Sequence, residues 1–179
     1  MDVLVLDGVL SEQECAALVT EAEATGFGDA PITTPRGFLM VPEVRNNTRV
    51  MMDDEVRARW LWERMRSWIP AEHRGARVVG LNERLRYYRY HPGQYFEWHR
   101  DGAFCRSSTE RSMLTLMIYL SDGFTGGSTE FTEADPVVPR RGTAVMFEHV
   151  MCHRGAPVLS GTKYVLRTDV MYRRAGRAA

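Results

Sequence analysis

Apolar and polar positions repeat with a helical period in the first half of the chain and with a strand-like period in the second. Near the N-terminus, a short apolar run at residues 3–6 reads as a strand, and Ser11 and Glu14 form a capping-box pattern before a helix. A second helix is predicted after Asp53 and Asp54, either of which can cap it. The expected buried stripes of the two helices are Cys15, Leu18, Val19 and Ala22 in the first, and Leu61, Met65, Trp68 and Ile69 in the second.

From Arg84 onward the pattern changes to runs of β-branched and aromatic residues separated by Pro-Gly, Asp-Gly, Gly-Gly and Arg-Gly turn signals. Such spacing predicts many antiparallel strands in two packed sheets. The predicted fold class is therefore mainly β (α+β), with a double-stranded β-helix, or jelly-roll, core that is cupin-like and has the N-terminal helices packed outside. We predict one domain over residues 1–179, with support at 1–83, the jelly roll at 84–173 and a tail at 174–179.

Composition agrees with a single domain and excludes some partners. The chain has 179 residues, of which 44% are hydrophobic, so it can bury one sizeable core. Its 23 basic residues balance its 23 acidic residues. Because no excess of charge is present, we expect neither a nucleic-acid partner nor a membrane surface as partner. The charge says nothing about oligomeric state.

Three cysteines, Cys15, Cys105 and Cys152, are an odd number without a C-x-x-C spacing. This argues against a disulfide framework and against a structural zinc site. The first ten residues lack a basic segment and a small-residue cleavage site, and no apolar run approaches the ~18 residues of a membrane span. We therefore expect a cytoplasmic protein.

The candidate chemistry lies in the segment His99-Arg100-Asp101. On an extended strand, residues two apart face the same way, so the imidazole of His99 and the carboxylate of Asp101 can meet one point, about 6.6 Å apart along the backbone. A second histidine from a distant strand would complete the two-histidine, one-carboxylate face of non-haem Fe(II) oxygenases. An H-x-D tripeptide alone is weak evidence, and the surrounding sequence is what makes it specific.

The segments that flank this tripeptide follow in a characteristic order: aromatic and polar residues before it, an apolar strand, a Gly-Gly turn, a second apolar strand, and a His-x-Gly-x-Pro-Val segment. These five segments are residues 86–98, 113–120, 126–131, 139–147 and 153–158, and a sixth, residues 161–167, contains Lys163. This succession resembles the catalytic region of the 2-oxoglutarate- and Fe(II)-dependent oxygenases, specifically the prolyl 4-hydroxylase-like branch. The resemblance covers roughly residues 84 to 173, about half of the chain.

The resemblance implies that Fe(II) is bound by His99, Asp101 and His153. His149 competes with His153 for the third position, because both follow the same apolar strand. His153 is preferred because it opens the His-x-Gly-x-Pro-Val segment and because Lys163 follows it at the offset that prolyl hydroxylases use. His149 then lines the pocket, supports a ligand, or lies on the surface.

The resemblance also implies a set of residues for the cosubstrate 2-oxoglutarate. Lys163, the single lysine of the chain, is the expected partner of its distal carboxylate, since a buried dianion needs a fixed cation. The alternative is a surface lysine on the last strand. Arg167 has the same strand parity and is expected at the other carboxylate, with substrate binding or an ion pair to Asp169 or Glu130 as alternatives. Tyr90, Tyr119 and Thr115 are the further candidates for hydrogen bonds to the cosubstrate, and Tyr88 is a weaker one.

The implied reaction hydroxylates an unactivated C–H bond with O2 and converts 2-oxoglutarate to succinate and CO2, with ascorbate as a supporting reductant. Because position 101 keeps its carboxylate, hydroxylation is favoured over halogenation. Two other classes use a similar barrel: a cupin-like hydrolase or isomerase with zinc or manganese, and a non-catalytic binding barrel. Neither needs a buried cation at position 163.

The sequence does not identify the organic substrate, for which peptidyl proline, a free amino acid and a small metabolite are all compatible. Loops at the mouth of a barrel commonly set specificity. The candidate substrate contacts are Arg49, Asn47 and Arg100, with the loop at residues 26–36 also placed over the mouth. For Arg49 the competing interpretation is an ion pair with Asp53 or Asp54 at the start of the second helix.

Overall fold

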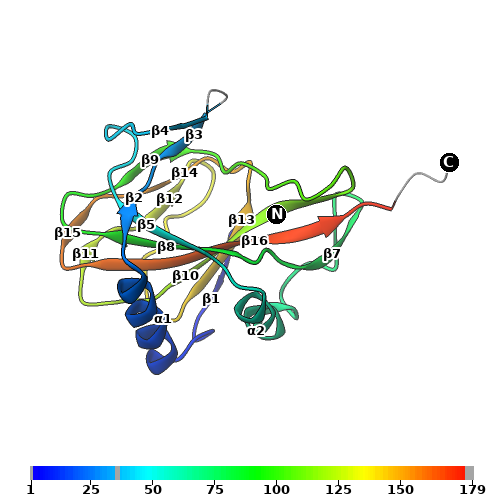
Figure 1. Ribbon diagram of the computed structural model, residues 1–179, viewed down its shortest axis with the longest axis horizontal. Coiled ribbons are helices and arrows are strands. Elements are labelled where there is room, and N and C mark those ends of the chain that lie inside the picture. The colour runs from blue at the N-terminus through cyan, green and yellow to red at the C-terminus, as the bar shows by residue number, and fades with distance from the viewer. Residues whose placement is uncertain (1, 35–36, 176–179) are drawn as a thin grey trace.

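The computed structural model describes residues 2–34 and 37–175. Two helices, α1 (Glu12–Thr25) and α2 (Glu55–Met65), lie on the same side of a large sheet, as Figure 1 shows. The predicted capping box is present, because the Ser11 hydroxyl accepts from Glu14 N and the Glu14 carboxylate accepts from Ser11 N. Asp54 caps α2 through the backbone N–H of Arg57 at 2.8 Å. None of the helices in the described residues is long and apolar enough to cross a membrane.

The large sheet is antiparallel, and within the described residues its main path has the order β1-β13-β10-β16-β8-β5-β2. Strand β7 pairs with the far half of β16, and β6 pairs with β7. Strands from before residue 84 therefore complete a sheet whose centre comes from the predicted jelly-roll region. The bounds are β1 (Leu4–Leu6), β2 (Gly28–Asp29), β5 (Thr48–Asp53), β6 (Glu72–His73), β7 (Ala76–Leu81), β8 (Arg84–Tyr90), β10 (Glu110–Tyr119), β13 (Ala144–Glu148) and β16 (Lys163–Arg173).

A smaller sheet faces the large one on the side opposite the helices (Figure 1). It consists of β12 (Thr129–Phe131), β14 (His153–Gly155) and β9 (Phe96–His99), and the pair β11 (Thr125–Gly126) and β15 (Val158–Ser160) continues next to it. A separate hairpin of β3 (Ile32–Thr34) and β4 (Gly37–Leu39) lies above β9. The two facing sheets confirm the predicted double-stranded β-helix.

Strand alternation divides the buried residues into two cores. On the outer face of the large sheet, Leu85, Tyr87, Leu116 and Leu166 pack with the buried stripes of α1 and α2. On the inner face, residues of opposite parity pack between the two sheets, and these are Tyr88, Tyr90, Met117, Tyr119 and Val165. The large sheet therefore contributes the inner-face positions of β8, β10 and β16 to any site between the sheets.

Two sequence predictions differ from the structure. Trp68 is 49% exposed, because α2 ends at Met65 and the helical period that placed Trp68 on the buried stripe does not continue; Ile69 is still buried. Arg49, a candidate contact at the mouth of the barrel, lies near the start of β5 in the large sheet. The predicted loop at residues 26–36 contains β2 and β3, and its positions 35–36 lie outside the described residues, as do positions 176–179 of the predicted tail.

Candidate active site

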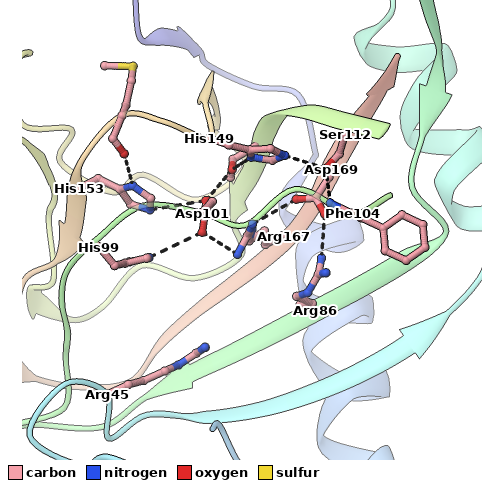
Figure 2. A network of polar contacts seen from close by, with 12 residues as sticks. Arg45, Arg86, His99, Asp101, Phe104, Ser112, His149, His153, Arg167 and Asp169 are labelled. Carbon is pink, nitrogen blue, oxygen red and sulfur yellow. Dashed lines mark hydrogen bonds and ion pairs between the residues drawn. The ribbon is translucent and has the colours of Figure 1, made fainter. Parts of the chain in front are cut away.

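Strands β9 and β14 bring the two histidines of the predicted triad together. They pair antiparallel with His153 directly opposite His99, so both rings project from one face of the small sheet, with centroids 4.2 Å apart. Asp101 follows β9, and its two carboxylate oxygens each lie 3.7 Å from one histidine Nε2. One ligand atom from each of the three residues lies within 4.8 Å of the others, as Figure 2 illustrates.

The histidine hydrogen bonds fix which ring nitrogen is free for a metal. His99 Nδ1 lies 2.7 Å from Glu97 O, and His153 Nδ1 lies 3.0 Å from Met151 O. A carbonyl can only accept, so each Nδ1 carries the proton and each Nε2 presents its lone pair toward Asp101. Two imidazoles and one carboxylate on a single face match the donor set of a non-haem Fe(II) site.

Electrostatics keep these groups in the states that bind a metal. Burial, reinforced by His153, lowers the pKa of His99 to about 4, and burial also lowers the pKa of His153. Burial alone would raise the pKa of Asp101, but the positive charge of Arg167 and the hydrogen bond from Thr115 hold it well below its usual value. Neutral imidazoles beside an ionised carboxylate need no deprotonation before a cation binds.

A chain of hydrogen bonds orients the Asp101 carboxylate. The Thr115 hydroxyl donates to Asp101 Oδ2 at 2.5 Å, so it accepts from His149 Nδ1, which lies 2.8 Å away. His149 Nε2 then accepts from the Ser112 hydroxyl at 2.8 Å, and Ser112 in turn accepts from Phe104 N (Figure 2). Asp101 N also donates to His149 O at 2.9 Å. His149 is therefore buried behind the carboxylate and bonded to the hydroxyl that contacts it, so it is not the surface histidine of one interpretation.

Arg167 holds the same carboxylate from the large sheet. Its guanidinium lies 2.9 Å from Asp101 Oδ1 and 3.2 Å from Asp169 Oδ1, and Asp169 also pairs with Arg86 at 3.2 Å. Of the ion pairs considered for Arg167, the one with Asp169 is present. Glu130 pairs with Arg154 instead. Contact of Arg167 with the cosubstrate stays a prediction.

Lys163 lies 3% exposed on the inner face of β16, so it is not the surface lysine of the alternative interpretation. Its Nζ donates to Gly127 O at 2.6 Å and lies over the rings of Tyr90 and Tyr119, at 5.2 and 5.4 Å from their centroids. Among the described residues no carboxylate pairs with it. Burial lowers its pKa to about 7, as expected for a cation that has no counter-ion.

Glycine is required at position 127, where φ is +66° and a Cβ would lie 3.1 Å from Lys163 Cδ. One pocket extends from the metal face to Lys163. Its lining comes from β8, β9, β10, β12, β14 and β16, and consists of Tyr88, Tyr90, Phe96, His99, Asp101, Met117, Thr129, His153, Gly155, Lys163, Val165 and Arg167. A cation stands at one end of this cavity and the metal-binding face at the other.

Comparisons with known proteins agree with this geometry. The family model described as the 2OG-Fe(II) oxygenase superfamily matches residues 85–168. The viral collagen prolyl hydroxylase of Paramecium Bursaria Chlorella virus-1, solved with 2-oxoglutarate, superposes with a TM-score of 0.70 at 25% identity over 96% of each chain. Over its catalytic region the chain is therefore similar to the 2OG-Fe(II) oxygenase superfamily, and its class is that of a dioxygenase. The predicted fold, enzyme class and use of Fe(II) and 2-oxoglutarate are thereby confirmed.

Two further relatives of this oxygenase carry prolyl hydroxylase names. The prolyl-4-hydroxylase of Pseudomonas putida matches with a TM-score of 0.68 at 18% identity over 97% of this chain and 93% of that one, a likeness of fold. A mimivirus protein (Acanthamoeba polyphaga mimivirus) named "Putative prolyl 4-hydroxylase" is 32% identical over 103 residues. That match spans 46% of this chain and 42% of the viral protein.

The other predicted site residues of the oxygenase occupy mixed positions. Tyr90 lines the cavity beside Lys163, its register partner. The Tyr119 ring lies under Lys163, while its hydroxyl donates to Thr129 at 2.7 Å. Thr115 does not line the cavity, because its hydroxyl is bound between Asp101 and His149. Cosubstrate contacts of these three residues stay predictions.

The three predicted substrate contacts lie in different environments. Arg100 is exposed and donates to Val150 O at 2.9 Å, because it alternates with the inward-facing residues on either side of it and so points away from the cavity. Asn47 is buried and accepts from Arg45 Nε at 2.8 Å. Arg49 lies on β5, opposite Tyr88. Its alternative partners are engaged elsewhere, Asp53 by Arg84 and Asp54 by Arg57.

Proposed function

We propose that this oxygenase hydroxylates an unactivated C–H bond of a prolyl residue in a peptide. The observation that carries the proposal is the single cavity with the His99, Asp101 and His153 face at one end and the unpaired cation Lys163 at the other. The prolyl substrate is supported by the names of the similar proteins, which include a collagen prolyl hydroxylase and a prolyl hydroxylase of Trichoplax adhaerens solved with a peptide fragment of hypoxia inducible factor.

In the proposed reaction His99, Asp101 and His153 hold Fe(II). When bound, Fe(II) and 2-oxoglutarate supply the oxidative chemistry, in which 2-oxoglutarate loses CO2 to give succinate and one atom of O2 enters the substrate. Lys163 binds the distal carboxylate of the cosubstrate and thereby fixes its orientation along the cavity. Arg167 stands beside Asp101 at the other end, where a second carboxylate can meet a cation.

The remaining residues keep the site rigid and dry. Thr115 and Arg167 contact different oxygens of Asp101, so the carboxylate cannot rotate without breaking one of these bonds. Phe96 stacks on the His99 ring at 3.5 Å with the planes 16° apart, and Phe147 packs edge-on to His153. These aromatic contacts fix both imidazoles and exclude water from their backs.

The test is turnover of synthetic prolyl peptides with Fe(II), 2-oxoglutarate and ascorbate. We expect succinate and a peptide that gains one oxygen atom on proline, both detected by mass spectrometry, and neither product from the His153→Ala variant. Succinate formed together with hydroxylated free amino acid, and no hydroxylated peptide, would contradict the peptidyl substrate. No succinate at all would favour the non-oxidative barrel considered above.

We also propose a reducing, cytoplasmic location. Support comes from the cysteines, since Cys15, Cys105 and Cys152 are all free thiols in the structure. Fractionation of the producing cells, with the protein followed by antibody, tests this. Recovery in an oxidising compartment would contradict it.

A further inference from the structure

Arg45 is a buried cation at the edge of the cavity, and no carboxylate of residues 2–34 or 37–175 pairs with it. It is 4% exposed, its Nε donates to Asn47, and its Nη2 is buried with no hydrogen-bond partner. The guanidinium lies over the rings of Tyr88 and Phe96, 4.6 and 4.4 Å from their centroids, and both rings line the cavity. Burying a guanidinium without a counter-charge is unfavourable, so the unused N–H groups point to a ligand.

Arg49 is a second unpaired cation on the same wall. It lies directly opposite Tyr88 in the antiparallel pair of β5 and β8, and directly opposed residues project from the same face, so Arg49 shares the inner face with Tyr88. Its partner on the other side is Gly28 of β2, which has no side chain to cover it. Arg49 is half-buried, and its side chain makes no hydrogen bond or ion pair within residues 2–34 and 37–175.

The carboxylates near these two arginines are already engaged. Asp169 is bound by Arg86 and Arg167, and Asp101 is bound by Arg167 and faces the metal. The positive charges also affect Tyr88. Burial raises the pKa of its hydroxyl, but Arg167, Arg45 and Arg86 lower it by more, so that this pKa lies below its ordinary value. The distal carboxylate of the cosubstrate is accounted for by Lys163. Arg45 and Arg49 remain for another anion.

We propose that Arg45 and Arg49 form a carboxylate-binding subsite, and that the substrate carries a carboxylate close to the carbon that is hydroxylated. Arg45 is the fixed half of the subsite, held by its two aromatic contacts and by Asn47. Arg49 is the half next to β2, the last strand on this side of the sheet, where Gly28 leaves it uncovered. Two guanidiniums can bind one carboxylate with parallel charge-assisted hydrogen bonds. This inference deepens the proposed function and rests on it for the position of the reacting carbon.

The experiment compares prolyl peptides that differ only next to the proline, with Asp or Glu in one set and Asn or Gln in the other. Affinity is measured by calorimetry on protein loaded with Mn(II) and 2-oxoglutarate, and hydroxylation is measured separately with Fe(II). We expect the acidic peptides to bind roughly ten- to hundredfold more tightly, as expected for hydrogen bonds between charged groups. A third arm with free proline tests whether the carboxylate belongs to the small molecule itself.

The variants assign the preference to the subsite. Arg49→Gln should bring the acidic-to-neutral affinity ratio close to one, and Arg49→Lys should recover part of it. Arg59→Gln, an exposed arginine on α2, is the matched control and should keep the full ratio. Equal binding of acidic and neutral peptides by the wild-type protein, or an unchanged ratio in Arg49→Gln, would overturn the proposal.

The two proposals fail in different ways. A preference for acidic peptides that depends on Arg49, without hydroxylation of proline in any of them, would refute the prolyl substrate and leave the subsite standing. Equal hydroxylation of neutral and acidic peptides would support the prolyl substrate and refute the carboxylate-binding subsite. Tighter binding of free proline than of every peptide, again dependent on Arg49, would assign the carboxylate to the small molecule.

Discussion

Replacing Lys163 by alanine should weaken the binding of 2-oxoglutarate more than any other single change outside the metal ligands. The ammonium is 3% exposed and, among the described residues, has only the carbonyl of Gly127 and two aromatic rings as partners. The alanine variant would leave the distal carboxylate of the cosubstrate buried and without a cation.

The magnitude follows from the cost of an unpaired buried charge. Burial lowers the pKa of Lys163 from 10.5 to about 7, which corresponds to roughly 5 kcal/mol of unfavourable free energy for the charged form when no anion is present. Removal of one partner from a buried pair typically costs ~3–5 kcal/mol. The dissociation constant of 2-oxoglutarate should therefore rise by at least about a hundredfold in Lys163→Ala.

Calorimetric titration of 2-oxoglutarate into the Mn(II)-loaded protein measures this directly, without turnover. Lys163→Arg is the control that keeps the charge, and it should retain part of the affinity if the cavity admits the larger group. A melting curve on each variant separates loss of binding from loss of folding. A dissociation constant for folded Lys163→Ala within about threefold of the wild-type value, well below the ~3 kcal/mol expected, would refute the assignment.

Three further predictions concern protons and metal. Burial lowers the pKa of Lys163 to about 7, whereas a bound carboxylate favours the ammonium. The affinity for 2-oxoglutarate should therefore be highest below about pH 7 and fall by up to about tenfold per pH unit above it. An affinity that does not change with pH, measured by calorimetry, would contradict this. His153→Ala should abolish Fe(II) binding whereas His149→Ala should retain it, as metal analysis of the dialysed proteins can show; equal loss in both would make His149 a ligand. Thr115→Val removes the hydrogen bond to one oxygen of Asp101 and should lower the affinity for Fe(II) roughly 10- to 100-fold. Thr115→Ser should restore the affinity. An unaltered affinity in the valine variant would show that Thr115 does not orient Asp101.

The parts of the fold and site that could be predicted from sequence are those that depend on short local sequence patterns. The capping box at Ser11 and the strand parity of His99 and Asp101 each depend on neighbouring residues alone. The same parity placed Lys163 and Arg167 on one face of β16. Identification of His153 needed the resemblance to a family, because nothing in the local pattern says that it lies opposite His99.

The support of Asp101 was not predictable, and the reason is a strand irregularity. Ser112 and Thr115 have opposite parity, so a regular strand would place them on opposite faces. A register shift between Ser112 and Leu114 changes the parity of β10, and both hydroxyls reach His149. The ion pair of Arg167 with Asp101 was missed for a related reason, since it joins β16 of the large sheet to the segment that follows β9 of the small sheet. Neither a bulge nor a contact between two sheets can be predicted from hydrophobic periodicity.

Succinate formation tests the central claim most directly. Purified protein should convert 2-oxoglutarate to succinate in the presence of Fe(II), ascorbate and O2, faster when the peptide substrate is added, with the product followed by nuclear magnetic resonance. Asp101→Ala, which removes the carboxylate of the metal face, should form none under the same conditions. If the wild-type protein forms no succinate, or if Asp101→Ala forms it at the wild-type rate, the assignment of His99, Asp101 and His153 as the active centre is wrong.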